Sequence, residues 1–227
     1  MDKLKAVVSS TEYVSSSLRI IKFGLANNLN FIPGQSIAIH INKKEDGIDN
    51  ETRYFSITSL PNKHFVEILV KHNHQSVVSN FLFSTLKEDD DLEVSGPYGK
   101  AVFRSDADRL TLIAGGTGIA PFISMIRHIS ENKIPMPVHL IYSSKKADEF
   151  AFKRELDKTK NFKVDYIATQ EQNWEGHKKR INLDYVQEKL VNEGLFYVCG
   201  PKQMVSDVAN YLKVFGVPEG NIIFEKD

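Results

Sequence analysis

Hydrophobic and polar positions follow two different patterns in the two halves of this chain. From residue 1 to about residue 104, apolar residues form short runs typical of β-strands, and turn-forming pairs such as Pro33-Gly34 separate them. The polar stretch Lys43–Thr52 is predicted to be a solvated loop. Many short strands between turns indicate an antiparallel barrel or sandwich. We expect strands at Lys5–Ser9, Leu18–Phe23, Ser36–Ile41, Tyr54–Ile57, Phe65–Lys71 and Leu92–Val94, and one helix at Ser76–Leu86.

After about residue 105, strand-like and helix-like patterns alternate. This alternation predicts a parallel sheet with helices on its faces, so we expect two domains, residues 1–104 and 105–227. The expected strands are Leu110–Ala114, Val138–Tyr142, Val164–Ala168, Phe196–Cys199 and Ile222–Phe224. The expected helices are Ala120–Ser130, Ala147–Thr159, Leu183–Asn192 and Pro201–Phe215.

Composition excludes several classes of function. The 227 residues contain 29 basic and 29 acidic side chains, so no net charge favours nucleic acid or an anionic membrane. No apolar stretch approaches the ~20 residues of a membrane span, and the N-terminus has no apolar signal core, so we expect a cytoplasmic protein. Cys199 is the single cysteine, which excludes a four-cysteine iron–sulfur or zinc site within this sequence. No metal site is predicted.

A glycine-rich turn, Gly115–Pro121, lies between an expected strand and an expected helix. Pro121 suits the first turn of a helix, because its missing N–H costs nothing there. The glycines allow close approach of an anion, and the N–H groups at the helix start can bind it. This geometry suits a dinucleotide pyrophosphate, although glycine-rich turns also occur for structural reasons alone.

Other polar or unusual residues follow the remaining strands of the second half. Ligands of an open parallel sheet bind outside the carboxyl ends of its strands, where Ser143–Lys146, Thr169–Glu171 and Cys199–Pro201 are expected. Cys199 is interpreted either as a small buried apolar residue or as a residue facing the ligand crevice. A Cys/His hydrolase would need His177 as the base, and we do not favour it because His177 lies in a polar, Lys-rich run.

Two clusters in the first half carry candidate chemistry. Arg53-Tyr54-Phe55-Ser56 is either an aromatic-rich strand or a site for a planar ring and a phosphate, with the guanidinium binding the anion. His72 and His74 have the spacing of two metal ligands on a strand, but no third ligand is evident, so a structural or exposed role is favoured.

Taken in order, these motifs resemble the ferredoxin–NADP⁺ reductase superfamily, in its bacterial NAD(P)H–flavin oxidoreductase branches. The resemblance covers nearly the whole chain. The matching segments are Phe31–Gln35 (F-x-P-G-Q), Arg53–Ser56 (R-x-Y-S), Leu69–Lys71, Ser76–Leu82 (G-x-x-S-x-Y-L), Gly96–Gly99 (G-P-x-G), Gly115–Pro121 (G-G-T-G-I-A-P), Cys199–Pro201 (C-G-P) and the aromatic–acid pair Phe224-Glu225. This resemblance implies an N-terminal antiparallel Greek-key β-barrel that binds flavin and a C-terminal Rossmann-like α/β domain that binds NAD(P).

The resemblance also implies roles for individual residues. Ser56, Cys199 and Glu225 are implied as catalytic, with Ser56 near flavin N5 and Cys199 beside the nicotinamide as a positioning group. Phe55 would stack on the flavin ring, where the family has a tyrosine. The flavin-binding set is Arg53, Tyr54, Phe55, Ser56, Val70, Lys71, Val78 and Ser79. The nucleotide-binding set is Gly116, Thr117, Gly118, Ser144, Lys145, Cys199, Gly200 and Pro201.

The implied activity is hydride transfer from nicotinamide C4 to flavin N5, followed by electron transfer to a separate acceptor. The flavin is expected to be FAD, with FMN as the alternative, and the donor NADPH or NADH. Lys145 and Lys146 follow the second strand of the sheet, with no acid before Asp148, which favours NADPH. The alternatives are a free-flavin reductase, which uses flavin as a substrate, and a non-catalytic flavin- or nucleotide-binding subunit of a larger complex. Ser76, where the family has glycine, argues for looser flavin binding.

Overall fold

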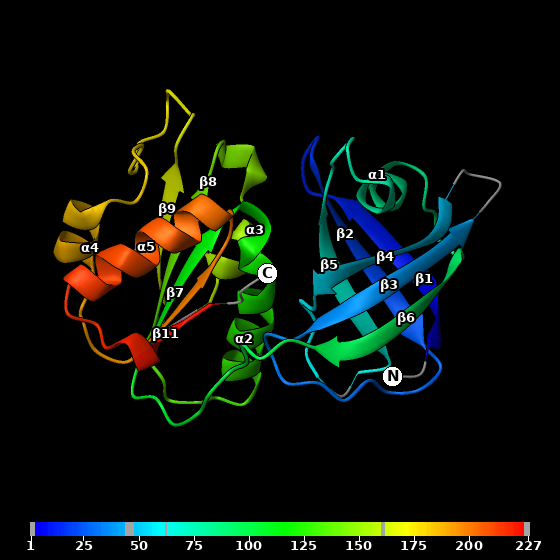
Figure 1. Ribbon diagram of the computed structural model, residues 1–227, viewed down its shortest axis with the longest axis horizontal. Helices are drawn as coiled ribbons and strands as arrows, with labels where there is room; N and C mark the ends of the chain where they lie inside the picture. The colour runs from blue at the N-terminus through cyan, green and yellow to red at the C-terminus, as the bar shows by residue number, and fades with distance from the viewer. Residues whose placement is uncertain (1–2, 44–47, 62, 160–161, 225–227) are drawn as a thin grey trace. The chain divides into compact units, whose positions relative to one another are not determined.

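The first half of the chain forms a six-stranded antiparallel sheet that closes on itself like a barrel. The computed structural model describes residues 3–43, 48–61, 63–159 and 162–224 (Figure 1). The strand order is β4-β3-β6-β1-β2-β5, so β6 returns to lie between β3 and β1. The strands are β1 (Leu4–Tyr13), β2 (Leu18–Leu25), β3 (Ser36–Lys43), β4 (Ile48–Ser56), β5 (Phe65–Lys71) and β6 (Asp91–Tyr98).

Closure of this sheet joins its two edge strands just beyond the end of β4. Ile57 forms an isolated antiparallel bridge with Ile68 of β5, and the N–H of Thr58 donates to the carbonyl of Glu67 over 2.8 Å. Alternate side chains of each strand point inward, and apolar residues such as Ile21, Ile39 and Ile68 are fully buried there. The hydrophobic pattern of the sequence therefore builds one core inside this sheet.

Helix α1 (Val77–Ser84) covers one end of the barrel-like sheet (Figure 1). The Ser76 hydroxyl caps it by accepting from the N–H of Ser79 over 3.3 Å. At the other end, the buried Arg19 guanidinium donates to the carbonyls of Leu82, Phe83 and Leu86 over 2.9 Å each. A cation at a helix C-terminus satisfies carbonyls that have no partner within the helix, so Arg19 fixes α1 on the sheet.

The second half forms a five-stranded parallel sheet in the order β11-β10-β7-β8-β9. Its strands are β7 (Leu110–Gly115), β8 (Val138–Ser144), β9 (Phe162–Ala168), β10 (Leu195–Cys199) and β11 (Ile222–Ile223). Its helices are α2 (Ala120–Glu131), α3 (Lys153–Leu156), α4 (Leu183–Lys189) and α5 (Lys202–Val214), with short 3₁₀ turns at Gly116–Ile119, Ala147–Glu149 and Glu219–Asn221. Both expected folds are confirmed.

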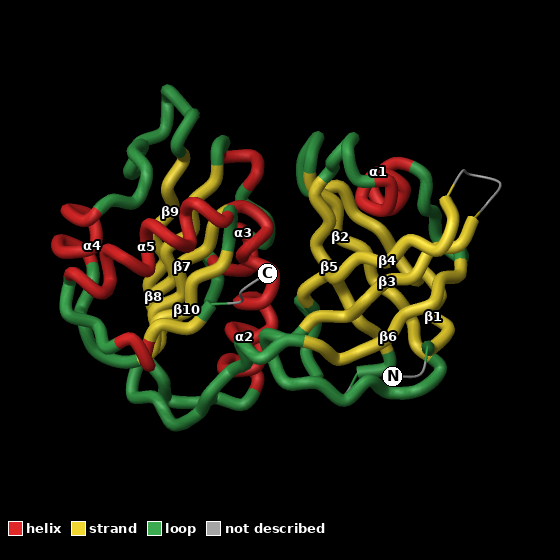
Figure 2. The backbone as a smooth tube through the Cα atoms, in the orientation of Figure 1, coloured by secondary structure: helices red, strands yellow, loops and turns green. Residues whose placement is uncertain are grey.

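Helices α4 and α5 pack on one face of this sheet (Figure 2). Val186 and Leu212 from these helices share a buried cluster with Ile113, Ile141 and Phe196 from three neighbouring strands. The chain runs from β7 outward through β8 and β9, then returns to place β10 on the other side of β7. The strand order therefore reverses between β7 and β10, which is where ligands bind in sheets of this kind.

Two local predictions were wrong. The stretch Ala147–Thr159 is not one helix, because Phe150 and Ala151 are buried and Phe152 takes a left-handed conformation (φ 60°). Phe150 packs against the Tyr142 and Tyr166 rings, and this packing outweighs local helix propensity. The stretch Lys43–Thr52 is not only a loop, because Ile48–Thr52 belongs to β4 and pairs with β3.

Contacts within the chain define two units, and each unit is built from two separate segments of the sequence. The first unit contains residues 1–103 together with 120–128, and the second contains residues 104–119 and 129–227. The first part of α2 thus groups with the barrel-like sheet. The boundary expected after residue 104 stays a prediction. Across the described residues, no helix is long and apolar enough to cross a membrane.

Candidate functional site

The motifs of the second half meet at the carboxyl edge of the parallel sheet. Cys199 of β10 is in register with Ala114 of β7, and Gly115 is in register with Ser143 of β8. The sequence predicted this edge, because parallel strands end on the same side of their sheet.

Glycine is required where the β7 turn meets the end of β10. A side chain at Gly118 would overlap the backbone carbonyl of Cys199, and one at Gly200 would lie 3.0 Å from the Cα of Gly115. A side chain at Gly115 would press on Pro201 and Met204 at the start of α5. Two strand ends and one helix start therefore pack backbone to backbone at the point where the strand order reverses.

Gly116 has the opposite surroundings. Its φ of 56° lies in the left-handed region that glycine adopts readily, and a Cβ there would meet no atom within 4 Å. Thr117 beside it is partly exposed. An open space at a glycine that begins a helical turn, next to glycines that have no room, would suit an anion.

The carboxyl end of β8 carries an acid that the sequence reading did not single out. The buried Ser144 hydroxyl donates to the carboxylate of Glu149 over 3.0 Å, whereas Lys145 is exposed. The Tyr142 hydroxyl accepts from the N–H of Ala151 over 3.2 Å and donates to the Glu149 carbonyl over 3.4 Å. Burial raises the pKa of Tyr142, so this hydroxyl stays protonated and holds the segment around Glu149. Only a structure reveals Glu149, because a broken helix brings it back to β8.

Cys199 and His177 do not come together. His177 bridges to Ile167 of β9, and β7 and β8 lie between β9 and β10 in the sheet. His177 lies on the side of β9 away from β8, so four strand spacings of about 4.8 Å place roughly 19 Å between the two segments. Cys199 therefore has no base from His177, which removes the hydrolase alternative.

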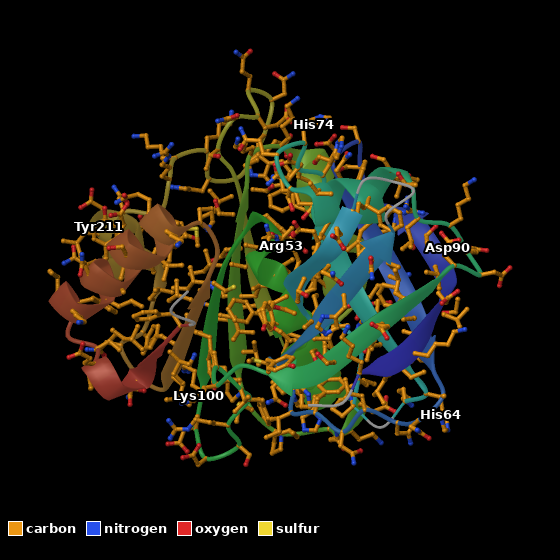
Figure 3. The ribbon with its side chains drawn as sticks, turned by 45° about the vertical axis from the view of Figure 1, so that its right-hand side comes forward. Arg53, His64, His74, Asp90, Lys100 and Tyr211 are labelled. Atoms are coloured by element: carbon orange, nitrogen blue, oxygen red, sulfur yellow. The ribbon has the colours of Figure 1, made fainter. Side chains whose placement is uncertain are left out.

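The predicted flavin segment lies at the end of β4. Arg53 is exposed there (Figure 3), and its Nη1 donates to the neighbouring carbonyl of Thr52 over 3.3 Å. Tyr54 is 63% exposed and meets the Tyr98 ring edge-on, with centroids 5.2 Å apart. Phe55 is partly buried against the core of the sheet, and the Ser56 hydroxyl accepts from Ser36 over 3.5 Å. The segment thus exposes a cation and an aromatic ring, while Phe55 anchors the strand.

The other predicted flavin residues fall on β5 and α1, which contact each other. Val70 and Val78 are buried in the core, so they can offer a ligand only their backbone. Lys71 is exposed at the end of β5, and Ser79 is partly buried in the first turn of α1. Glu225 lies outside the described residues.

His72 and His74 belong to a cluster of aromatic rings in which the two imidazoles are tilted by 59° to each other. Their ring centroids are 4.1 Å apart, His72 lies flat on Phe83, and its Nε2 bonds Asn80 over 3.0 Å. Within the described ranges, no group of three or more His, Cys, Asp or Glu side chains is placed to hold a metal ion.

Comparison with known proteins identifies both halves. The oxidoreductase FAD-binding domain family matches residues 5–103, and the oxidoreductase NAD-binding domain family matches residues 112–210. The toluate 1,2-dioxygenase electron transfer component of Pseudomonas putida is 31% identical over 98% of this chain and 67% of its own length. The chain spans about half the length of the curated flavohemoproteins that it matches.

Solved structures agree on the fold. The FAD/NAD-binding domain of nitric oxide dioxygenase from Vibrio cholerae O1 biovar El Tor superimposes with a TM-score of 0.89 at 22% identity, covering 99% of this chain and 98% of that one. The ferredoxin reductase in carbazole 1,9a-dioxygenase superimposes with a TM-score of 0.87 at 25% identity, covering 98% of this chain and 68% of that one.

The fold and the matched domains define an oxidoreductase that binds FAD and a nicotinamide dinucleotide. The chain belongs to the ferredoxin–NADP⁺ reductase family. The residues present fit both cofactors. The open cradle at Gly116 suits a dinucleotide phosphate. The exposed guanidinium of Arg53, on the strand that α1 packs against, suits the flavin diphosphate.

Proposed function

We propose that this chain takes hydride from NADPH or NADH and passes the electrons to an acceptor outside this sequence. Bound FAD supplies the chemistry, because it accepts a hydride and releases electrons singly or in pairs. The observation that carries the proposal is the backbone contact between Gly118 and Cys199 at the reversal of strand order, in a chain that matches both cofactor domains.

The residues of this chain bind and orient the two cofactors and exclude water from them. In this proposal, Arg53 neutralises the flavin phosphates, and Ser56 donates a hydrogen bond near flavin N5. Gly116–Gly118 hold the nucleotide phosphates through backbone N–H groups, and Cys199 orients the nicotinamide. Glu225 is proposed to hydrogen-bond near Ser56 or the nicotinamide. Such orientation lowers the barrier by converting an encounter into a reaction between held groups.

The acceptor is proposed to be a separate electron-transfer protein. Electrons need a further carrier, because one cysteine in 227 residues cannot ligate a four-cysteine cluster. The relatives named electron transfer components of dioxygenases support an acceptor of this kind.

One observation favours a second candidate, a free-flavin reductase. The Ser76 hydroxyl accepts the hydrogen bond of the Ser79 N–H at the start of α1. A glycine at position 76 would leave this N–H available to a flavin phosphate. Looser retention of flavin follows, and flavin then behaves as a substrate.

The test is to purify the protein, desalt it and add NADH or NADPH without oxygen. A yellow protein that bleaches supports the proposed flavoenzyme. A colourless protein that oxidises the nucleotide only when flavin is added supports the flavin reductase. A protein that does neither contradicts both and leaves a binding subunit.

A further inference from the structure

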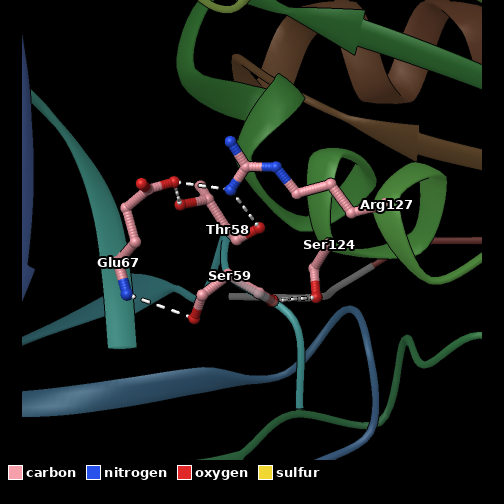
Figure 4. A network of polar contacts seen from close by, with 5 residues as sticks. All are labelled: Thr58, Ser59, Glu67, Ser124 and Arg127. Carbon is pink, nitrogen blue, oxygen red and sulfur yellow. Dashed lines mark hydrogen bonds and ion pairs between the residues drawn. The ribbon is translucent and has the colours of Figure 1, made fainter. Parts of the chain in front are cut away.

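A buried polar network joins helix α2 to the barrel-like sheet inside the first unit (Figure 4). Nη1 of Arg127 donates to Oε1 of Glu67 over 2.6 Å and to the Thr58 carbonyl over 3.0 Å. The Thr58 hydroxyl donates to the same Glu67 oxygen over 2.7 Å. The side chains of Arg127 and Glu67 are only 22% and 11% exposed, so water screens this ion pair weakly.

A second pair of bonds lies one helical turn away on α2. The Ser124 hydroxyl donates to the Ser59 carbonyl over 2.8 Å, and the Ser59 hydroxyl accepts from the N–H of Glu67 over 3.2 Å. Ser124, Ser59 and Thr58 are all buried. Because residues 124 and 127 share one face of the helix, α2 is held at two points along its length.

The two sides of this network adjoin the two cofactor motifs in sequence. Thr58 and Ser59 lie two and three positions after Ser56, and α2 begins where the turn Gly116–Ile119 ends. A rotation or slide of α2 on the sheet therefore moves the end of the nucleotide turn through the covalent chain.

The chemistry of the network indicates that it fixes the position of α2 more than it stabilises the folded state. A buried ion pair is often no more stabilising than apolar residues of the same volume, whereas its hydrogen bonds accept only a narrow geometry. We propose that Arg127 and Glu67 are positioning residues for hydride transfer, because they fix the register of α2 against the segment that follows the flavin motif. This inference rests on the proposed function.

The magnitude of the effect follows from the geometry of hydride transfer. A misplacement of the reacting atoms by about 1 Å, even when a change far from them causes it, costs on the order of a hundredfold in rate. Loss of the network is therefore expected to slow flavin reduction while leaving flavin and nucleotide affinity unchanged, since no network residue is assigned to either cofactor.

The experiment compares wild type with R127M, E67Q and S124A under anaerobic conditions. The limiting rate of flavin bleaching at saturating NADH or NADPH is measured beside the affinities for FAD and the nucleotide. R127M is expected to slow bleaching roughly tenfold to a hundredfold at unchanged affinities. E67Q keeps an oxygen that accepts both hydrogen bonds and should stay closer to wild type, as should R127K, which restores the cation.

L212A is the matched control, because Leu212 is buried in the α5 cluster away from the network, and its truncation lowers stability. If L212A bleaches at the wild-type rate and R127M bleaches more slowly, the result supports a positioning role of Arg127. Equal slowing in L212A, or wild-type rates in R127M and S124A, overturns it while the proposed function stands. If wild type itself does not bleach, both proposals fail. If R127M does not fold, the same comparison is made on S124A and R127K.

Discussion

The backbone carbonyl of Cys199 occupies the space that a side chain at Gly118 would fill. This relationship joins the G-G-T-G turn after β7 to the C-G-P segment after β10, so neither motif can change alone. It also places Cys199 at the edge of the sheet where the glycine-rich turn begins.

Substitution of Gly116 and of Gly118 by alanine is expected to have different effects on stability and on nucleotide binding. Gly118→Ala forces a methyl group into the Cys199 backbone and should lower the free energy of unfolding by about 3 kcal/mol. Gly116→Ala meets no protein atom and should cost about 1–2 kcal/mol for its left-handed backbone, yet weaken nucleotide binding by obstructing the cradle. Denaturant unfolding and nucleotide titration separate the two effects. Gly220→Ala, also in open space, is the control; unchanged nucleotide affinity in Gly116→Ala would contradict the cradle.

Cys199 is expected to orient the nicotinamide without forming a bond to it. Cys199→Ala should keep the fold and slow anaerobic flavin bleaching by roughly tenfold, because a packing contact beside the reacting ring is lost. Stopped-flow absorbance at saturating nucleotide measures this rate. A complete loss of reduction in a folded variant would instead indicate a covalent nucleophile.

Arg53 is expected to determine how firmly the protein keeps its flavin. Arg53→Ala removes a charge-assisted contact to phosphate, so the affinity for FAD should fall by at least about tenfold. Arg104→Ala is a matched control, since Arg104 is also an exposed arginine but pairs with Asp106 over 2.7 Å. Fluorescence of FAD released on desalting reports the difference. Equal loss from both variants would exclude a specific role for Arg53.

Lys145 and Glu149 are expected to act in opposite directions on nucleotide choice. A cation reads the 2′-phosphate of NADPH, whereas a carboxylate binds the ribose hydroxyls of NADH and repels that phosphate. Lys145→Ala should lower kcat/KM for NADPH about tenfold and spare NADH, and Glu149→Gln should shift preference toward NADPH. Steady-state assays with both nucleotides in each variant measure this. An unchanged kcat/KM for NADPH in Lys145→Ala would contradict a role of Lys145 in nucleotide choice.

His139 is expected to make the protein less stable in acid. Burial lowers its pKa, and its bond to Asp165 over 2.8 Å raises the pKa by less, so the folded state holds a neutral imidazole that donates to the carboxylate. The unfolded chain binds this proton near pH 6.5, so stability falls as the pH drops below that value. His139→Gln should reduce the dependence of the free energy of unfolding on pH below about 6.5, measured by denaturant titrations at several pH values. His64→Gln, an exposed position (Figure 3), should leave it unchanged, and equal slopes in both variants would contradict the assignment.

The fold was largely predictable because period-2 and helical patterns each reflect burial on one side of an element. The failure at Ala147–Thr159 came from tertiary packing, since nothing in the local sequence shows that Phe150 packs on Tyr142 and Tyr166. Strand Ile48–Ser56 was underestimated because its polar residues pair with β3 through backbone bonds that side-chain polarity does not reveal.

The positions of the candidate motifs in the fold were predictable where one short segment supplies them, as at Gly116–Gly118 after β7 and Arg53–Ser56 at the end of β4, and their roles stay predictions. Contacts between distant segments were not predictable. Ser144 meets Glu149 only because the helix breaks, and Arg127 meets Glu67 across 60 positions of sequence. Neither pair leaves a signal in a single sequence.

The grouping of residues 120–128 with the barrel-like sheet limits how this chain can recombine with its relatives. An exchange of the C-terminal part at residue 104 would replace Arg127 while keeping Glu67, and would strand a buried carboxylate without its cation. Where the other parent has no basic residue at position 127, a functional chimera must therefore take both residues from one parent, and the boundary for such an exchange is set by this ion pair.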